Sequence, residues 1–144
     1  MSEIACELCE QPGGEIIFRH AKLRIALIDD AQYPGFCRVI WNAHAKEMTD
    51  LSAADRMLLM TAVWQVEAAL REVMQPDKIN IASLGNLTPH LHWHVIPRFA
   101  GDAHFPAPVW AEPKRTPEMI DLTARCALLP ALRASISRHM DRIF

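Results

Sequence analysis

The sequence predicts an α+β domain, with an antiparallel β-sheet of about five strands, a long helix packed against it and helices at the C-terminus. Short β-prone segments come first along the chain, one long helical segment follows, and further β-prone segments precede a helical C-terminal region. The composition, 51% hydrophobic and 22% charged, is that of a globular protein. Its 144 residues are the usual length of one domain, so we expect residues 1–144 to form a single domain.

Three β-prone segments precede the long helix. Residues 15–20 and 23–30 form the first two, with a short break between them. Residues 36–41 form the third and follow a Pro-Gly turn. Short connections of this kind favour antiparallel neighbours in one sheet.

Residues 51–74 give the strongest helix prediction in the chain. Ser52 can cap the first turn, with Asp55 in the position of a capping box, and Pro76 ends the segment. Apolar residues recur close to the helical period, which predicts that one stripe packs on the sheet. The residues that we assign to this stripe are Met57, Met60, Trp64, Ala68 and Val73.

Two further strands and two helices complete the prediction. Residues 78–86 form a strand that ends in Gly-Asn, and residues 90–99 form the next. After a proline-containing loop, Thr116 and Pro117 resemble an N-cap and the first helical residue. Pro130 interrupts this helix and separates it from a final one.

The charge and hydropathy patterns exclude some classes of partner. The formal net charge is −2 and no basic stripe is present, which argues against nucleic-acid binding. No apolar run is long enough to cross a bilayer, and the acidic N-terminal residues are unlike a signal peptide. We therefore expect a cytoplasmic protein without a membrane partner.

Three histidines occupy alternate positions in the segment TPHLHWHVIPR. On a strand, His90, His92 and His94 would share one face, each about 6.6 Å from the next, and the intervening residues would pack on the core. One interpretation is a solvent-exposed face, and a second is a metal site, although ligands along a straight strand converge poorly on one ion. The third is covalent catalysis, since a neutral imidazole nitrogen is a competent nucleophile.

The chain has four cysteines, two of them in a Cys-x-x-Cys pair. In a reducing compartment, Cys6 and Cys9 indicate a metal-binding or redox pair, or simply two reduced thiols. Cys37 and Cys126 lie among apolar residues and are predicted to be small core residues.

The segment HLHWHVI resembles the signature of the histidine triad (HIT) superfamily of nucleotide hydrolases and transferases, in which histidines alternate with apolar residues. Residues 25–51 also resemble that family's strand, turn and strand before the long helix. Asn80 and Gly85-Asn86 fall where the family has an asparagine and a Gly-Gln. The resemblance covers roughly residues 4–110 and implies a HIT-like fold.

The resemblance implies a nucleotide hydrolase or nucleotidyltransferase that forms a nucleotidyl-histidine intermediate. His92 would attack the α-phosphorus of a purine nucleotide phosphoramidate or dinucleoside polyphosphate. His94 would contact the phosphate, and His90 or a main-chain carbonyl would orient the ring of His92. A homodimer is implied, and no catalytic cofactor is required.

The resemblance also implies a nucleotide-binding set, in which Asp29 would bind the ribose hydroxyls, Asn80 and His94 the phosphate, and Asn86 would replace the family's glutamine. Turn chemistry is the alternative role of Asp29. Phe36 replaces a frequent family histidine, and Leu87 replaces a Ser or Thr whose hydroxyl helps to protonate the leaving group. These departures leave open the leaving group and the alternative of a nucleotide-binding or scaffold protein with little turnover.

A zinc-bearing branch of the same superfamily has a Cys-x-x-Cys pair. The resemblance to this branch implies that Cys6, Cys9, His44 and His90 bind Zn²⁺. A closed set of two cysteines and two histidines would be structural, because catalytic zinc keeps an open position.

Some aromatic and polar residues belong to none of these patterns, so we assign them to the core or the surface from the usual burial of their residue types. We expect the core to contain Trp41, Trp64 and Trp93, and the surface to contain His20, Arg98, His104 and His139. A phosphate contact is the alternative role of Arg98, and Trp110 is open between a cap on the base pocket and a core or dimer contact.

Overall fold

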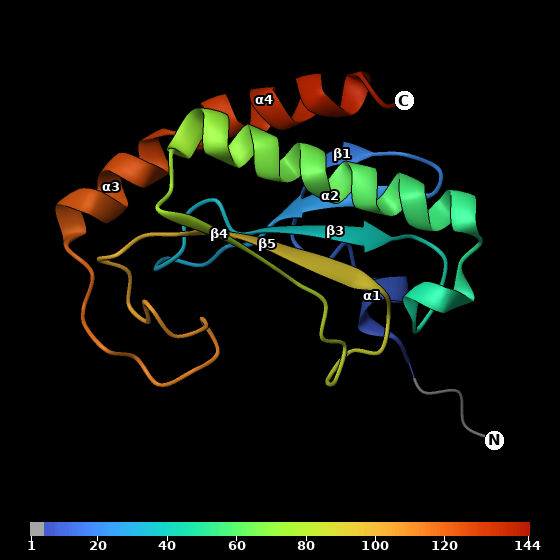
Figure 1. Ribbon diagram of the computed structural model, residues 1–144, viewed down its shortest axis with the longest axis horizontal. Helices are drawn as coiled ribbons and strands as arrows, with labels where there is room; N and C mark the ends of the chain where they lie inside the picture. Colours follow the sequence, from blue (N-terminus) through green and yellow to red (C-terminus); the bar gives the residue numbers. More distant parts are fainter. Residues whose placement is uncertain (1–4) are drawn as a thin grey trace.

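A computed structural model describes residues 5–144 and shows one five-stranded antiparallel sheet (Figure 1). The spatial order is β1-β2-β3-β5-β4, so β1 and β4 are the edge strands. The strands span Glu15–Arg19 (β1), Leu23–Leu27 (β2), Cys37–Trp41 (β3), Lys78–Ala82 (β4) and His92–Arg98 (β5). The predicted fold class is confirmed.

Helices α2 and α4 cover one face of the sheet (Figure 1). Helix α2 spans Ala53–Met74 after a 3-10 turn, η1, at Met48–Asp50, and α3 at Met119–Ala127 leads into α4 at Leu129–Asp141. The main core lies between these helices and the sheet. Its fully buried members include Leu23, Ile25, Val39, Val95, Leu59, Val63, Leu70 and Ile136.

The opposite face is covered by the short helix α1, Glu7–Glu10, and by loops. Leu8 of α1 packs on Ala26 and Ile40, and Tyr33 and Phe36 pack near Ile96 in a second small cluster. Figure 1 shows α1 on the side of the sheet away from α2. Side chains that point to this face therefore lie outside the main core.

The predicted start of α2 is confirmed, whereas the predicted packing stripe is only partly correct: Met60 and Val73 pack against the core. The hydroxyl of Ser52 accepts a hydrogen bond from the main-chain N–H of Asp55 at 3.1 Å. Met57 is 60% exposed and Trp64 is 51% exposed. Apolar residues occur on most sides of this helix, so their spacing alone did not identify the inner face. The buried face consists of Leu59, Ala62, Val63, Val66, Ala69, Leu70 and Met74.

Several default assignments are also corrected. Arg98, His104 and His139 are buried rather than at the surface, because each finds polar partners inside the fold. Cys126 is exposed on α3 rather than in the core, while the prediction for Cys37 is confirmed. Helix α3 begins at Met119 with Glu118 as its N-cap, later than Thr116.

Within residues 5–144, none of the helices combines the length and the apolar character that crossing a membrane requires.

Candidate active site and metal centre

His92 and His94 lie on the face of β5 that points away from the main core. Pairing with β3 places His92 opposite Ile40 and His94 opposite Arg38. Both imidazoles are buried, and their ring centroids are 4.9 Å apart at an interplanar angle of 83°. The strand thus brings two histidines into contact on one face, called here the histidine face.

His90 does not continue this row, which corrects the prediction of three equivalent imidazoles along one strand. Strand β5 begins at His92, and the main-chain N–H of His90 bonds to the carbonyl of Thr88 at 2.8 Å in a local turn. The Nε2 atom of His90 lies 2.5 Å from the carbonyl oxygen of Trp41, and its Nδ1 faces the cysteines. The turn after Pro89 therefore directs this ring into a different site.

A main-chain carbonyl holds the ring of His92. Its Nδ1 lies 2.5 Å from the carbonyl oxygen of His90, so Nδ1–H is the donor. The second nitrogen, Nε2, is then left with its lone pair. A neutral imidazole held in this tautomer has the form that nucleophilic attack requires.

Both histidines resist protonation. Burial lowers the pKa of His92, the bond to the His90 carbonyl opposes this, and the charge of Arg38 adds to the lowering. Burial also lowers the pKa of His94 to about 4, with further contributions from His92 and Arg38. The pair is therefore neutral near pH 7.

Aromatic side chains border the histidine face. The ring of Phe36 meets His94 edge-on at 5.6 Å, and that of Trp110, in the loop after β5, lies 5.1 Å from His94. Trp110 remains 52% exposed. An exposed aromatic ring beside the reactive pair is suited to contact a flat base.

Asn80 lies on β4 and joins a buried polar network at the end of β5. Its Oδ1 accepts a hydrogen bond from Nη1 of Arg98 at 2.7 Å, and Nε of Arg98 pairs with Asp102 at 2.8 Å. Burial opposes ionisation of Asp102, but hydrogen bonds from Arg98 and from three main-chain N–H groups lower its pKa to about 2. Arg98 ends a strand and Asp102 lies in the following loop, so their spacing gave no local sequence signal for this pair.

The two other predicted nucleotide-binding residues lie in loops. Asp29 is exposed after β2, beside Asp30 in a surface groove that Cys126 and Arg133 also line. Asn86 is exposed between β4 and β5. Within residues 5–144, no hydrogen bond joins either side chain to the histidine face, and their roles stay predictions.

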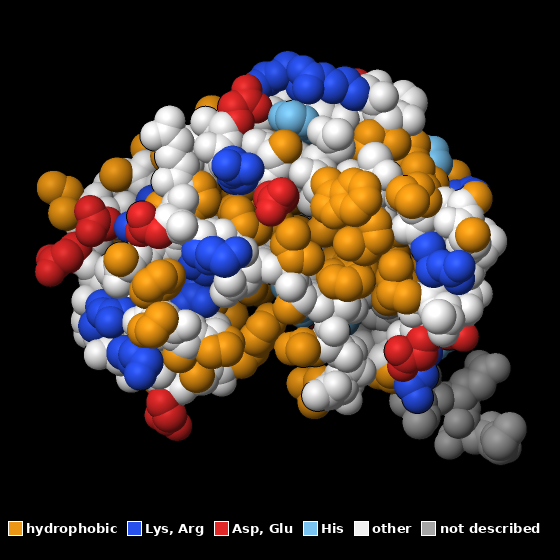
Figure 2. Space-filling view, viewed as in Figure 1, with side chains coloured by type: hydrophobic (Ala, Val, Ile, Leu, Met, Phe, Trp, Pro, Cys, Tyr) orange, Lys and Arg blue, Asp and Glu red, His pale blue; other side chains and the backbone are white. Residues whose placement is uncertain are grey.

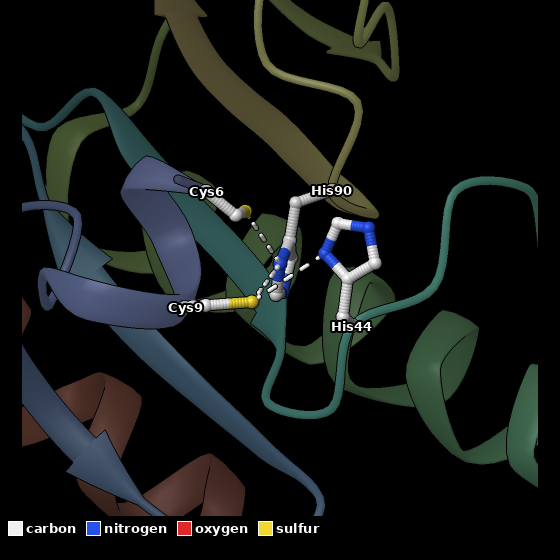
Figure 3. Close-up of side chains that lie close together, drawn as sticks. All are labelled: Cys6, Cys9, His44 and His90. Atoms are coloured by element: carbon white, nitrogen blue, oxygen red, sulfur yellow. Dashed lines mark hydrogen bonds between the residues drawn. The ribbon is translucent and has the colours of Figure 1, made fainter. Parts of the chain in front are cut away.

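Cys6, Cys9, His44 and His90 converge on one point, although they come from three separate segments of the chain (Figure 3). One ligand atom from each lies within 4.8 Å of all the others. Nδ1 of His90 is 3.3 Å from Sγ of Cys6 and 3.4 Å from Sγ of Cys9. Nδ1 of His44 is 3.4 Å from Sγ of Cys9.

This cluster fits a tetrahedral metal ion. Zinc bonds of about 2.3 Å to sulfur and about 2.0 Å to nitrogen place neighbouring ligand atoms about 3.5 Å apart. The Nε2–H of His90 donates to the carbonyl of Trp41, which leaves its Nδ1 lone pair facing the thiols. The structure therefore supports a Cys/His metal cluster of the predicted composition.

Arg24 anchors the N-terminal arm that carries the cysteines. From β2, its guanidinium donates to the carbonyl oxygens of Leu8 at 2.7 Å and Pro12 at 2.9 Å. Leu8, between the two cysteines, is buried. The arm is thus held by contacts that do not depend on a metal.

Comparison with known proteins identifies relatives of this chain. Residues 10–101 match the family model of the HIT domain. Over 106 residues the chain is 28% identical to an AP-4-A phosphorylase from Mycobacterium tuberculosis, covering 69% of this chain and 53% of the relative. Over 97 residues it is 29% identical to a bis(5'-nucleosyl)-tetraphosphatase (asymmetrical) from Schizosaccharomyces pombe, covering 63% and 53%. The chain spans about half the length of these relatives.

Solved structures share the fold. A histidine triad protein from Bradyrhizobium japonicum is 31% identical with a TM-score of 0.71, covering 89% of this chain and 91% of that one. A HIT protein from Sinorhizobium meliloti is 29% identical with a TM-score of 0.70, covering 89% and 90%. A Zn-bound histidine triad family protein from Mycobacterium smegmatis is 20% identical with a TM-score of 0.60, covering 90% and 88%, and so shares the fold.

Proposed function

This chain belongs to the HIT domain family, and we propose that it is a nucleotide hydrolase or nucleotidyltransferase that acts at the α-phosphorus of purine nucleotide conjugates. The observation that carries the proposal is the state of His92. Its Nδ1–H is bonded to a main-chain carbonyl, its Nε2 keeps a lone pair, and its pKa is lowered. A neutral, oriented imidazole beside a second buried histidine is suited to nucleophilic catalysis.

The proposed reaction has two steps. Nε2 of His92 forms a bond to the α-phosphorus while the bond from phosphorus to the leaving group breaks, and the leaving group takes the electron pair. Water then attacks the same phosphorus and loses a proton to solvent. The phosphorus–nitrogen bond breaks with its electron pair returning to Nε2 of His92, and the nucleoside monophosphate is released. His94 would contact the phosphate, and the carbonyl of His90 would stabilise the positive charge that develops on His92.

Dinucleoside polyphosphates are the first substrate class to test, because the curated relatives carry the names of enzymes acting on such compounds. Nucleotide phosphoramidates are the second. Leu87 is almost fully exposed and offers no hydroxyl to a leaving group. This departure also motivates the alternative of a nucleotide-binding protein with little turnover.

The nucleotide contacts form part of the proposal. Asn80 keeps its amide N–H donors, since Arg98 uses only its oxygen, and these could donate to a phosphate. We retain Asp29 for the ribose and Asn86 for the region before the histidine face. Trp110 would contact the base.

We propose that the metal cluster binds a structural Zn²⁺. Four protein ligands leave no open position for substrate, and none of the reaction steps requires the ion. When bound, zinc would join the N-terminal arm to His90 and so fix the carbonyl that orients His92.

A homodimer is the proposed assembly, with a nucleotide as the small-molecule partner. Figure 2 shows apolar side chains gathered over the middle of α2 and the edge of the sheet beside it. The exposed apolar residues of α2, β4 and the loop after β4, called here the apolar patch, are Met57, Trp64, Ile81 and Leu84. A patch beside a free strand edge is suited to a second copy of the chain. The free thiols are consistent with the proposed cytoplasmic location.

Single-turnover release of AMP tests the proposed chemistry. Wild type and His92→Gly are each mixed, in excess over substrate, with a diadenosine polyphosphate and separately with adenosine phosphoramidate. We expect AMP from the wild type and none from the variant, and the faster substrate identifies the substrate class. If neither protein releases AMP while both bind it, the nucleotide-binding alternative is correct.

A further inference from the structure

Arg38 brings a positive charge to the histidine face without a carboxylate partner. It lies in β3 directly opposite His94, so the two side chains project to the same side of the sheet. Its Nη1 donates to the carbonyl of Gly13 at 3.2 Å. Its Nε is buried and has no partner within residues 5–144, and no ion pair there includes it.

Two other arginines on the same side of the sheet show how this fold normally satisfies a buried guanidinium. Arg24 bonds to three carbonyl oxygens and to the side chain of Asn42. Arg98 bonds to Asp102, to Asn80 and to one carbonyl. Arg38 is half-buried, and its enclosed Nε makes no hydrogen bond, so partners within the fold do not account for the position of this charge. An unpartnered donor beside the two histidines is available to a bound group.

The charges around Arg38 favour an anionic ligand. His94 is its cross-strand neighbour, and the next pair along the two strands is Ile40 and His92. Burial lowers the pKa of His94 to about 4, so Arg38 supplies the positive charge beside this neutral ring. Glu7 is the acid that acts on it through space, and Glu7 is exposed on α1 without an ion pair to it.

We propose that Arg38 is a specificity-determining residue that binds the phosphate next to the one attacked by His92, so that the enzyme favours conjugates whose leaving group is itself a phosphate. This inference rests on the proposed function. A planar guanidinium donates well to phosphate oxygens. An amine leaving group carries no negative charge for Arg38 to stabilise.

The loss of the leaving-group hydroxyl at Leu87 supports the same assignment. An amine must be protonated as it departs, whereas a phosphate can leave as an anion. When the bond from the α-phosphorus to the bridging oxygen breaks, the electron pair stays on that oxygen. The N–H groups of Arg38 would stabilise this charge, and no proton donor is needed. Charge stabilisation by Arg38 would thus replace proton donation from position 87.

Substrate competition tests the proposal. kcat/KM is measured with diadenosine tetraphosphate and with adenosine phosphoramidate for wild type, Arg38→Met and Arg38→Lys. The substrate ratio is kcat/KM for diadenosine tetraphosphate divided by kcat/KM for adenosine phosphoramidate. In Arg38→Met, we expect this ratio to fall by about 10- to 100-fold, the usual effect of losing a hydrogen bond to a charged group. Arg38→Lys keeps the positive charge but loses the planar guanidinium, so its substrate ratio should lie between those of the wild type and Arg38→Met. Arg19→Met, on the exposed edge strand β1, is the matched control and should keep the wild-type ratio.

Nucleotide binding separates this proposal from the proposed function. In His92→Gly, which is not expected to turn over, ADP and AMP are titrated by calorimetry with and without Arg38→Met. We expect ADP to bind about tenfold more tightly than AMP, and this preference to disappear with Arg38→Met. Absence of turnover in the wild type would overturn the proposed function while this preference still tests Arg38. Equal affinities for ADP and AMP, or an unchanged substrate ratio in Arg38→Met, would overturn the role of Arg38.

Discussion

At the scale of single residues, the carbonyl oxygen of His90 decides which nitrogen of His92 carries the proton. The same residue uses its ring for the metal cluster and for the carbonyl of Trp41. One residue therefore contributes to both sites, through its main chain to the reactive pair and through its side chain to the cluster. This arrangement would place the proposed metal site directly beside the proposed reaction centre.

His94 should make the protein sensitive to mild acid, and His94→Asn should reduce that sensitivity. The pKa of His94 in the folded protein is about 4, lowered from 6.5 chiefly by burial. As the pH falls from about 6.5 toward 4, the unfolded chain takes up a proton that the native state refuses, so stability is lost across this range. Asparagine does not titrate and removes this contribution.

Urea midpoints at about pH 7 and about pH 5 measure the effect. The difference between them should be smaller in His94→Asn than in the wild type, with the lowered pKa of His92 accounting for a remainder. His20→Asn is the control, because His20 stacks on Phe144 outside the histidine face. An undiminished difference in His94→Asn would contradict the prediction.

At the scale of elements, the N-terminal arm is an example of a short segment with little intrinsic stability. Helix α1 has only four residues, too few to persist alone. Its stability comes from burial of Leu8, from the bonds of Arg24 to its carbonyls, and from the proposed zinc. Removing one ligand should therefore loosen the arm without unfolding the sheet.

Cys9→Ser tests the metal cluster. The wild type should contain about one equivalent of zinc per chain, and the variant well below half, because a tetrahedral site loses most of its affinity with one thiolate. Melting temperature should fall, and amide exchange should accelerate in residues 5–14. Cys126→Ser is a matched control, since Cys126 is exposed on α3. Less than half an equivalent in the wild type, or full zinc in Cys9→Ser, would exclude the site.

Local sequence patterns predicted most elements, and tertiary partners decided what those patterns missed. Turn residues and the Ser52 cap placed the strands and α2 closely, since these signals act within a few residues. The predicted inner stripe of α2 was only partly correct because apolar residues occur on several sides of the helix. The burial of Arg98 depends on Asp102 and Asn80, and such pairings are fixed only once strands and loop assemble.

The candidate site was predictable in part for the same reason. Alternation along the chain indicated that His92 and His94 share a face. The convergence of Cys6, Cys9, His44 and His90 followed from the family resemblance, because no local spacing joins residues so far apart. Arg38 gave no sequence signal, since its importance depends on the strand that lies opposite.

At the scale of the whole molecule, the sheet separates stability from chemistry. One face packs on α2 and α4 and holds the main core, while the other carries His92, His94 and the Cys/His cluster. The proposed substrate contacts could therefore vary on one face without disturbing the core on the other. The edge strand β4 lies beside the exposed apolar residues of α2, so we expect the assembly contact at this edge.

The apolar patch should hold two copies of the chain together through β4. Ile81 is partly exposed on this edge strand, and Trp64 is half-exposed on α2. Placing a carboxylate in a desolvated contact is strongly unfavourable, so Ile81→Asp should weaken the dimer by at least about tenfold. Sedimentation equilibrium should show the wild type at twice the chain mass of 16.3 kDa and the variant shifted toward one copy. Ile120→Asp makes the same change at an exposed position on α3 and should leave the mass unchanged. A wild type that sediments as a single copy, or an Ile81→Asp variant as dimeric as the wild type, would place the assembly contact elsewhere or remove it.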